Sequence, residues 1–126
     1  MSEFVTIGHV SIWDDLVEIR IETESYVVPV PSVQRVLHSG SDEVIYQHVP
    51  QTTLGDEGSA IEHAQVAGTI TLSRTHRSVT VRPNPGWRLF LINAEAFRDV
   101  MRGILPRATV SEIINHKSKS RQLSFA

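Results

Sequence analysis

Cysteine is absent from this chain of 126 residues, and aromatic residues make up only 6% of it. Without a thiol the protein has no disulfide, no thiolate-bound zinc, no iron–sulfur cluster and no cysteine nucleophile. Long apolar runs are also missing, since stretches such as 89–92 are far shorter than the ~20 residues of a membrane-spanning helix. The first residues do not combine a basic with an apolar segment, so we expect a cytoplasmic protein without a membrane span.

Recognisable catalytic and cofactor motifs are missing as well. The six histidines are scattered, with no i, i+4 pair and no His-x-His, so no metal ligands are assigned. No Gly-x-Ser-x-Gly elbow and no phosphate-binding glycine pattern occurs. Adjacent carboxylates such as Asp14 and Asp15 fall in polar turns, where solvation is the default role. We therefore assign no catalytic, cofactor-binding or metal-binding residue and expect a protein that is not an enzyme.

Alternating apolar and polar residues predict strands in the first thirty positions. In 16–22 the apolar side chains fall on one face and the charged ones on the other, as in a half-buried strand. Polar turns on both sides make 4–13 and 26–30 its antiparallel neighbours. Gly8 predicts a bulge or a break in the first of them.

Two prolines then interrupt the pattern. Pro29 and Pro31 remove two backbone donors, so the chain is expected to leave the sheet interior there. Periodicity does not decide whether 32–37 is a strand or a short helical turn. The segment 50–63 is poor in apolar residues and is predicted to be a long loop. Further strands are predicted over 43–49, 66–72, 79–81 and 87–92.

The period changes near the end of the chain. Asn93 is a suitable N-cap for an amphipathic helix over 93–105, and Pro106 ends it. Its apolar stripe, at i, i+3, i+4, i+7 and i+8, consists of Phe97, Val100, Met101, Ile104 and Leu105. A capping-box pattern over 109–112 predicts a second short helix. No internal repeat is visible.

These elements predict a mainly β (α+β) fold: a small antiparallel split barrel or curled sheet of about seven strands, capped by a C-terminal amphipathic helix. The order, with strands first and the helix last, resembles that of pleckstrin-homology-like and lipid-binding GRAM-like split barrels over about residues 3–105. A two-layer α+β sandwich is the alternative. We expect one β-rich domain at 1–107, which includes the helix 93–105, followed by a short helix and polar tail at 108–126.

Charge is divided unevenly along the chain. Residues 1–63 carry eleven acidic and two basic side chains, whereas residues 64–126 carry three acidic and ten basic ones, giving net charges of −9 and +7. Three interpretations remain open. The two halves neutralise each other within one molecule; or distinct faces meet across a self-association contact or on an oppositely charged protein; or the basic half touches nucleic acid or an anionic lipid surface.

A predicted hairpin and the helix after it concentrate the positive charge. Arginine binds carboxylates and phosphates through two parallel hydrogen bonds, so an anionic ligand or partner is expected to dock there. The candidate binding residues are Arg74, His76, Arg77, Arg82, Trp87, Arg88, Arg98 and Arg102.

The sequence thus predicts a non-enzymatic protein-interaction module, adaptor or regulatory, that uses a charged surface to bind another protein or a second copy of itself. One alternative is a nucleic-acid-binding domain that uses the basic C-terminal half. Another is a small-molecule-binding barrel or an uncharacterised enzyme, in which the 50–63 loop acts as a lid. No cofactor is expected.

Overall fold

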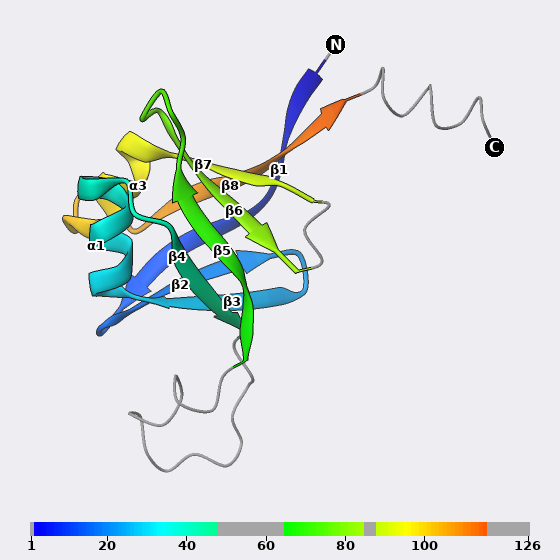
Figure 1. The fold of residues 1–126 in the computed structure, drawn as a ribbon. Coiled ribbons are helices and arrows are strands. Elements are labelled where there is room, and N and C mark those ends of the chain that lie inside the picture. The colour runs from blue at the N-terminus through cyan, green and yellow to red at the C-terminus, as the bar shows by residue number, and fades with distance from the viewer. Residues whose placement is uncertain (1, 48–64, 85–87, 116–126) are drawn as a thin grey trace, which may run out of the picture.

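The computed structural model describes residues 2–47, 65–84 and 88–115. Eight antiparallel strands form a closed barrel in which each strand pairs with its neighbours in the sequence and β8 closes onto β1 (Figure 1). The elements are β1 (Ser2–Trp13), β2 (Leu16–Ile21), β3 (Glu24–Pro29), α1 (Val30–Ser39), β4 (Glu43–Gln47), β5 (Val66–Leu72), β6 (Ser78–Pro83), β7 (Phe90–Asn93), α3 (Ala94–Met101) and β8 (Arg107–Asn115).

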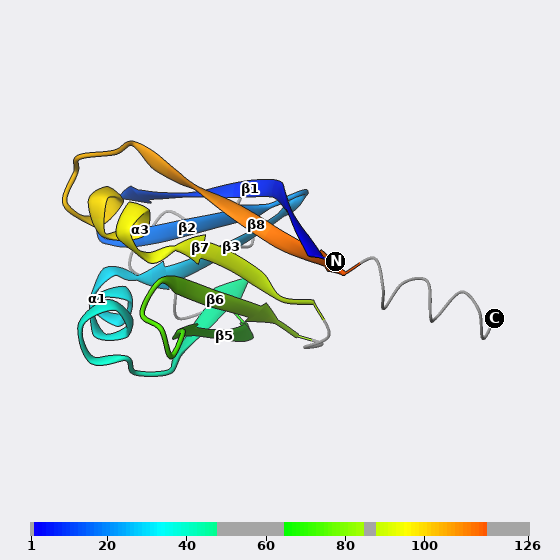
Figure 2. The same cartoon turned by 90° about the horizontal axis from the view of Figure 1, so that it is seen from above.

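Both helices cover the same end of the barrel (Figure 2). Helix α1 begins directly after Pro29, which serves as its N-cap without a side-chain hydrogen bond. The segment 32–37, which periodicity left undecided, is therefore helical. Helix α3 begins as predicted, because the Asn93 side chain accepts a hydrogen bond of 2.9 Å from the backbone N–H of Ala96.

The core fills the barrel interior and the space beneath the helices. In β2 and β6 every second residue is buried, with the same burial pattern along both strands, as expected where alternate side chains point into a barrel. Val33 and Val36 from α1, together with Phe97 from α3, are fully buried against this interior. The helices therefore seal one end of the barrel with apolar side chains.

The mainly β class is confirmed, but the sheet is a closed barrel of eight strands and not a split barrel of about seven or a two-layer sandwich. The prediction of a second helix from the capping box at 109–112 is wrong, because these residues belong to β8. Ala108 and Val110 are buried and alternate with more accessible neighbours, and β8 pairs with β1 on one side and β7 on the other. Since β8 follows α3, the helix is not the last element, unlike in the order expected from the resemblance.

Helix α3 also ends earlier than the predicted 105. Gly103 adopts a left-handed φ of 77°, and the N–H groups of Ile104 and Leu105 turn back to donate to the carbonyl of Asp99 at 2.8 and 3.2 Å. Ile104 is 64% exposed and Leu105 37% exposed. The apolar stripe therefore stops at Met101. The predicted loop 50–63 lies outside the described residues.

The order of elements is the same in the two halves of the chain. β1, β2, β3, α1 and β4 form the first half, and β5, β6, β7, α3 and β8 form the second. In a closed barrel of eight strands in sequence order, strands four apart lie across the barrel from each other. The two halves are thus related by about half a turn around the barrel axis, although no repeat was visible in the sequence.

Equivalent backbone hydrogen bonds support this relation. In the first pair, Glu22 N–H donates to Ile7 O (3.0 Å) and Asn84 N–H donates to Ala67 O (2.7 Å). In the second pair, Val30 N–H donates to Asp15 O (3.0 Å) and Ala94 N–H donates to Arg77 O (2.9 Å). The first pair joins the end of the second strand to the first strand of each half. The second pair joins the first residue of each helix to the turn between those strands.

Gly8 and Gly68 occupy equivalent places in the two halves, where the register of strand pairing shifts. A Cβ atom on Gly8 would lie 1.8 Å from the carbonyl oxygen of Arg20, and one on Gly68 would lie 2.2 Å from that of Arg82. Only glycine allows the strands to approach this closely. The bulge predicted at Gly8 is confirmed.

Candidate functional site

The turn between β5 and β6 is built around Ser73. Its backbone N–H donates to the carbonyl of Ser78 at 2.9 Å, and its side-chain oxygen accepts from the N–H of Ser78 at 3.2 Å. The N–H of His76 donates to the carbonyl of Ser73 at 2.9 Å, and His76 adopts a left-handed φ of 62°. This tight local network fixes the tip of the hairpin.

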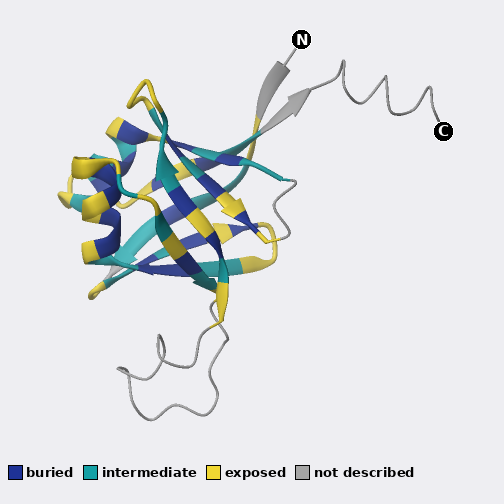
Figure 3. Cartoon of the chain, in the orientation of Figure 1, coloured by how far each residue is buried: buried dark blue, intermediate teal, exposed yellow. Residues whose placement is uncertain are grey.

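Three of the predicted binding residues lie on this tip. Arg74, His76 and Arg77, which we call the basic turn, are all exposed (Figure 3). Neither arginine forms an ion pair within residues 2–47, 65–84 and 88–115. The turn therefore presents two guanidinium groups whose hydrogen-bond donors face solvent.

Arg98 joins the basic turn from helix α3. His76, Arg77 and Arg98 line an open hollow of about 410 Å³ together with Asn93 and Glu95. Arg98 is held in place because its Nη2 donates to the carbonyl oxygen of Leu37 at 3.2 Å. Leu37 lies in the last turn of α1. The hollow combines two guanidinium groups with one carboxylate, and so favours an anionic group.

The equivalent turn in the first half has the opposite charge. Asp14 and Asp15, which we call the acidic turn, connect β1 to β2 and are both exposed. Asp15 and Arg77 are equivalent residues, because each accepts a hydrogen bond from the first residue of the helix in its half. The acidic and basic turns therefore lie across the barrel from each other at the helix end.

The other predicted binding residues lie apart from this cluster. Arg102 caps α3 and contacts Asp99 at 3.5 Å. Arg82 is exposed on β6, close to the barrel end away from the helices. Trp87 lies outside the described residues. The structure thus brings Arg74, His76, Arg77 and Arg98 together and does not bring the whole predicted set together.

Arg88 lies at the end of the barrel away from the helices, where two carboxylates bind it. Its Nε and Nη2 donate to the two oxygens of Glu112 at 2.9 and 2.8 Å, and its Nη1 donates to Glu22 at 2.9 Å. Its guanidinium carbon also lies 4.9 Å from the centre of the Phe90 ring. Hydrogen bonds to Glu112 are the main reason that the pKa of Arg88 is raised.

Few of the charges of the two halves neutralise each other by direct contact. Among the ion pairs of the described residues, Arg88–Glu22 joins the acidic first half to the basic second half. Arg35–Glu43 lies within the first half and Arg102–Asp99 within the second. Within the described residues, the ion pairs therefore neutralise little of the uneven charge of the two halves.

Sequence reasoning missed the residues that shape these places. Ser73 builds the basic turn, and Glu22 and Glu112 bind Arg88. Glu22 and Arg88 are 66 positions apart, so only the strand pairing brings them together. An alignment of the two halves of the sequence on Gly8 and Gly68 would have pointed to these residues.

No protein-family model, curated protein or solved structure matches this chain. In the described part of the chain, no group of three or more histidine or acidic side chains is placed to hold a metal ion. No helix among the described residues is long and apolar enough to cross a membrane.

Proposed function

We propose that this chain is a protein-interaction module that binds a second copy of itself, with the acidic turn of each copy against the basic turn of the other. The observation that carries the proposal is the opposite charge of Asp15 and Arg77 at equivalent places of the two halves. Both turns are exposed at the helix end of the barrel. Charges of this kind accelerate and orient association when they face opposite charges on a partner.

The symmetry of such a contact follows from the barrel. If two copies meet helix end to helix end about a two-fold axis that is perpendicular both to the barrel axis and to the line joining the two turns, each acidic turn faces a basic turn. This happens because the two turns lie across the barrel from each other. A closed, two-fold arrangement is also the most frequent one in soluble homo-oligomers.

The test is sedimentation velocity of the full chain at about 0.05 M and about 0.5 M salt, between which exposed charges become strongly screened. A dimer at low salt that dissociates at high salt is the expected result. Nucleic-acid absorbance is recorded in the same run. A monomer under both conditions would overturn the proposal, and a monomer that carries salt-sensitive nucleic acid would favour the nucleic-acid alternative.

Charge reversal makes the test specific. Arg77→Glu and Asp15→Arg are each expected to give a monomer, because like charges then face each other. An equimolar mixture of the two variants should form a heterodimer, since both contacts again join opposite charges. The matched control is Arg82→Glu, which reverses an exposed arginine near the other end of the barrel and should leave the dimer unchanged.

A further inference from the structure

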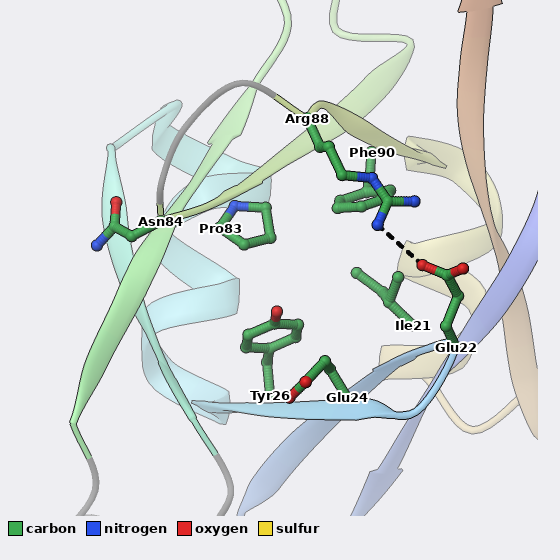
Figure 4. Close-up of a pocket in the computed structure, with 8 residues that line it drawn as sticks. All are labelled: Ile21, Glu22, Glu24, Tyr26, Pro83, Asn84, Arg88 and Phe90. Carbon is green, nitrogen blue, oxygen red and sulfur yellow. Dashed lines mark hydrogen bonds and ion pairs between the residues drawn. The ribbon is translucent and has the colours of Figure 1, made fainter.

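The barrel end away from the helices carries a second feature that does not depend on the basic turn. Eight residues line a hollow of about 180 Å³ there (Figure 4). Strand register places Tyr26 and Phe90 at equivalent positions of the two halves, and counting back two residues from each pairs Glu24 with Arg88. Equivalent backbone hydrogen bonds pair Glu22 with Asn84. The pairs used below are Glu22 with Asn84, Glu24 with Arg88, and Tyr26 with Phe90.

In the second half, a guanidinium group lies at this end of the barrel. Arg88 is held between the carboxylates of Glu22 and Glu112 and lies over the ring of Phe90. In Figure 4 the Arg88 side chain points toward Glu22 across the mouth of the hollow. The molecule therefore contains a complete guanidinium-binding arrangement, with two acceptors and an aromatic ring, occupied by its own side chain.

In the first half, the same scaffold has a short acid where the second half has the arginine. Glu24 takes the place of Arg88, and Gln47 takes the place of Glu112, because each faces the aromatic strand of its half in the same register. Gln47 Nε2 donates to Glu24 at 2.9 Å, just as Arg88 contacts Glu112. A glutamate does not extend as far as an arginine, so the space that Arg88 fills in the second half is open in the first.

That space is a hollow of about 270 Å³ lined by Glu24, Tyr26, Gln47, Val66, Ala67 and Asn84. A water molecule in the liquid takes ~30 Å³, so the hollow has room for a planar guanidinium group. Its polar lining offers the carboxylate of Glu24 and the amide oxygens of Gln47 and Asn84 as acceptors. The Tyr26 ring corresponds to the Phe90 ring under Arg88.

The charge of the lining also favours a cation. Glu22 and Glu112 already bind Arg88, whereas Glu24, the charged residue that lines this hollow, contacts the amide of Gln47 and has no ion pair within the described residues. We propose that the hollow beside Tyr26 binds a guanidinium group supplied from outside the chain, with Glu24 as its ionic partner and Asn84 and Gln47 as amide acceptors. An arginine side chain of a peptide and a free guanidinium compound share this chemistry.

The experiment is an NMR titration of the full chain with N-acetyl-arginine methylamide and, separately, with agmatine. Saturable shifts of the backbone amides of Glu24, Tyr26 and Gln47 are expected. The matched control ligand is N-acetyl-citrulline methylamide, which keeps the planar shape but lacks the charge. It should bind more weakly by a factor of about ten or more. Tighter binding of the capped arginine than of agmatine would identify a peptide arginine as the source of the guanidinium group. Equal binding of the two ligands would identify a free guanidinium compound as the source.

Three variants decide whether the hollow is the site. Glu24→Gln removes the ionic partner and should weaken binding about tenfold. Asn84→Glu places a carboxylate where the second half has Glu22 and should tighten binding several-fold. Glu24→Arg supplies an internal guanidinium in the manner of Arg88 and should abolish binding. Circular dichroism of each variant establishes that the barrel is intact.

Two results would overturn the proposal. One is equal binding of the arginine and citrulline compounds, because binding would then not depend on the positive charge of the guanidinium group. The other is binding that Glu24→Gln and Glu24→Arg leave unchanged in folded protein, because the shifts would then come from another place on the barrel.

Discussion

Glu24 and Arg88 occupy equivalent places in the two halves of the barrel but carry opposite charges. Glu24 lies two residues before Tyr26 on β3, and Arg88 lies two residues before Phe90, the first residue of β7. Glu24 binds Gln47, which faces Tyr26, and Arg88 binds Glu112, which faces Phe90. Asp15 and Arg77 repeat the relation at the other end of the barrel. One backbone plan used twice thus presents two different chemical surfaces at each end.

Arg88 is expected to stabilise the barrel, because it connects the segment just before β7 to the β2–β3 turn and to the middle of β8. Arg88→Met keeps an apolar stem over Phe90 but leaves the mostly buried carboxylate of Glu112 without this cation. We expect a loss of about 1–2 kcal/mol in the free energy of unfolding, less than for a fully buried pair, since Arg88 is one-third exposed. Urea denaturation measures it.

The control for this prediction is Arg82→Met. Arg82 is exposed on the neighbouring strand, and within the described residues it has no ion pair. Its replacement should change the free energy of unfolding by less than ~0.5 kcal/mol. Equal losses in the two variants would show that the Arg88 contacts contribute no more than any surface arginine.

Gly8 is expected to tolerate no side chain. A Cβ atom there would lie 1.8 Å from the carbonyl oxygen of Arg20, and the other atoms it would meet are also backbone atoms of β2, which are not the end of a flexible side chain. Gly8→Ala should therefore lose about 3 kcal/mol or more, and Gly68→Ala should behave in the same way. Gly40→Ala is the comparison, because φ is also positive there (68°) but the space is open, so a loss of only about 1 kcal/mol is expected. Thermal unfolding that ranks Gly8→Ala with Gly40→Ala would contradict the close approach of the strands.

The end of helix α3 can be tested by two truncations. Phe97 is fully buried and Ile104 is 64% exposed, although the sequence placed both on one apolar stripe. Phe97→Ala should lose about 3–5 kcal/mol in the free energy of unfolding. Ile104→Ala should change it by less than ~0.5 kcal/mol. A large loss in Ile104→Ala would mean that the stripe continues past Met101 in solution.

Periodicity predicted the strands of this fold well, and it failed where two patterns coincide. The segment 16–22 alternates cleanly and forms β2. At 109–112, by contrast, the residues fit both a capping box and an alternating strand. Pairing on both sides of β8 decides between them, and that pairing depends on β1 and β7, which are distant in the sequence. Local signals therefore could not identify the strand that closes the barrel.

The candidate sites follow the same division. The charge of Arg74 and Arg77 and their place in a hairpin turn were predictable from the sequence. The equivalence of Glu24 with Arg88 was not, because the two halves share little more than a glycine and an alternating arginine-containing strand in each. Backbone hydrogen bonds and register reveal the relation, since packing constrains the backbone of a barrel more tightly than the identity of its surface side chains.

Tyr26 reports on the environment of the open barrel end through its pKa. Burial raises the pKa of its phenol, the nearby carboxylate of Glu24 raises it further, and Arg88 opposes the shift. Titration of tyrosinate absorbance in a Tyr46→Phe background isolates Tyr26, because the chain has two tyrosines. The midpoint is expected above the ordinary value, and Glu24→Gln should lower it part of the way back.

The same shift has a consequence for stability. Because the pKa of Tyr26 is raised in the folded state, its contribution is fully present below the ordinary pKa of a phenol and is lost as the pH rises through the folded value. Tyr26→Phe removes this dependence, so the free energy of unfolding of the variant should fall less steeply with alkaline pH than that of the parent. If the parent and the variant lose stability in parallel, then the Tyr26 phenol is not shielded by the barrel, and the ring on which a guanidinium group would lie is accessible to water.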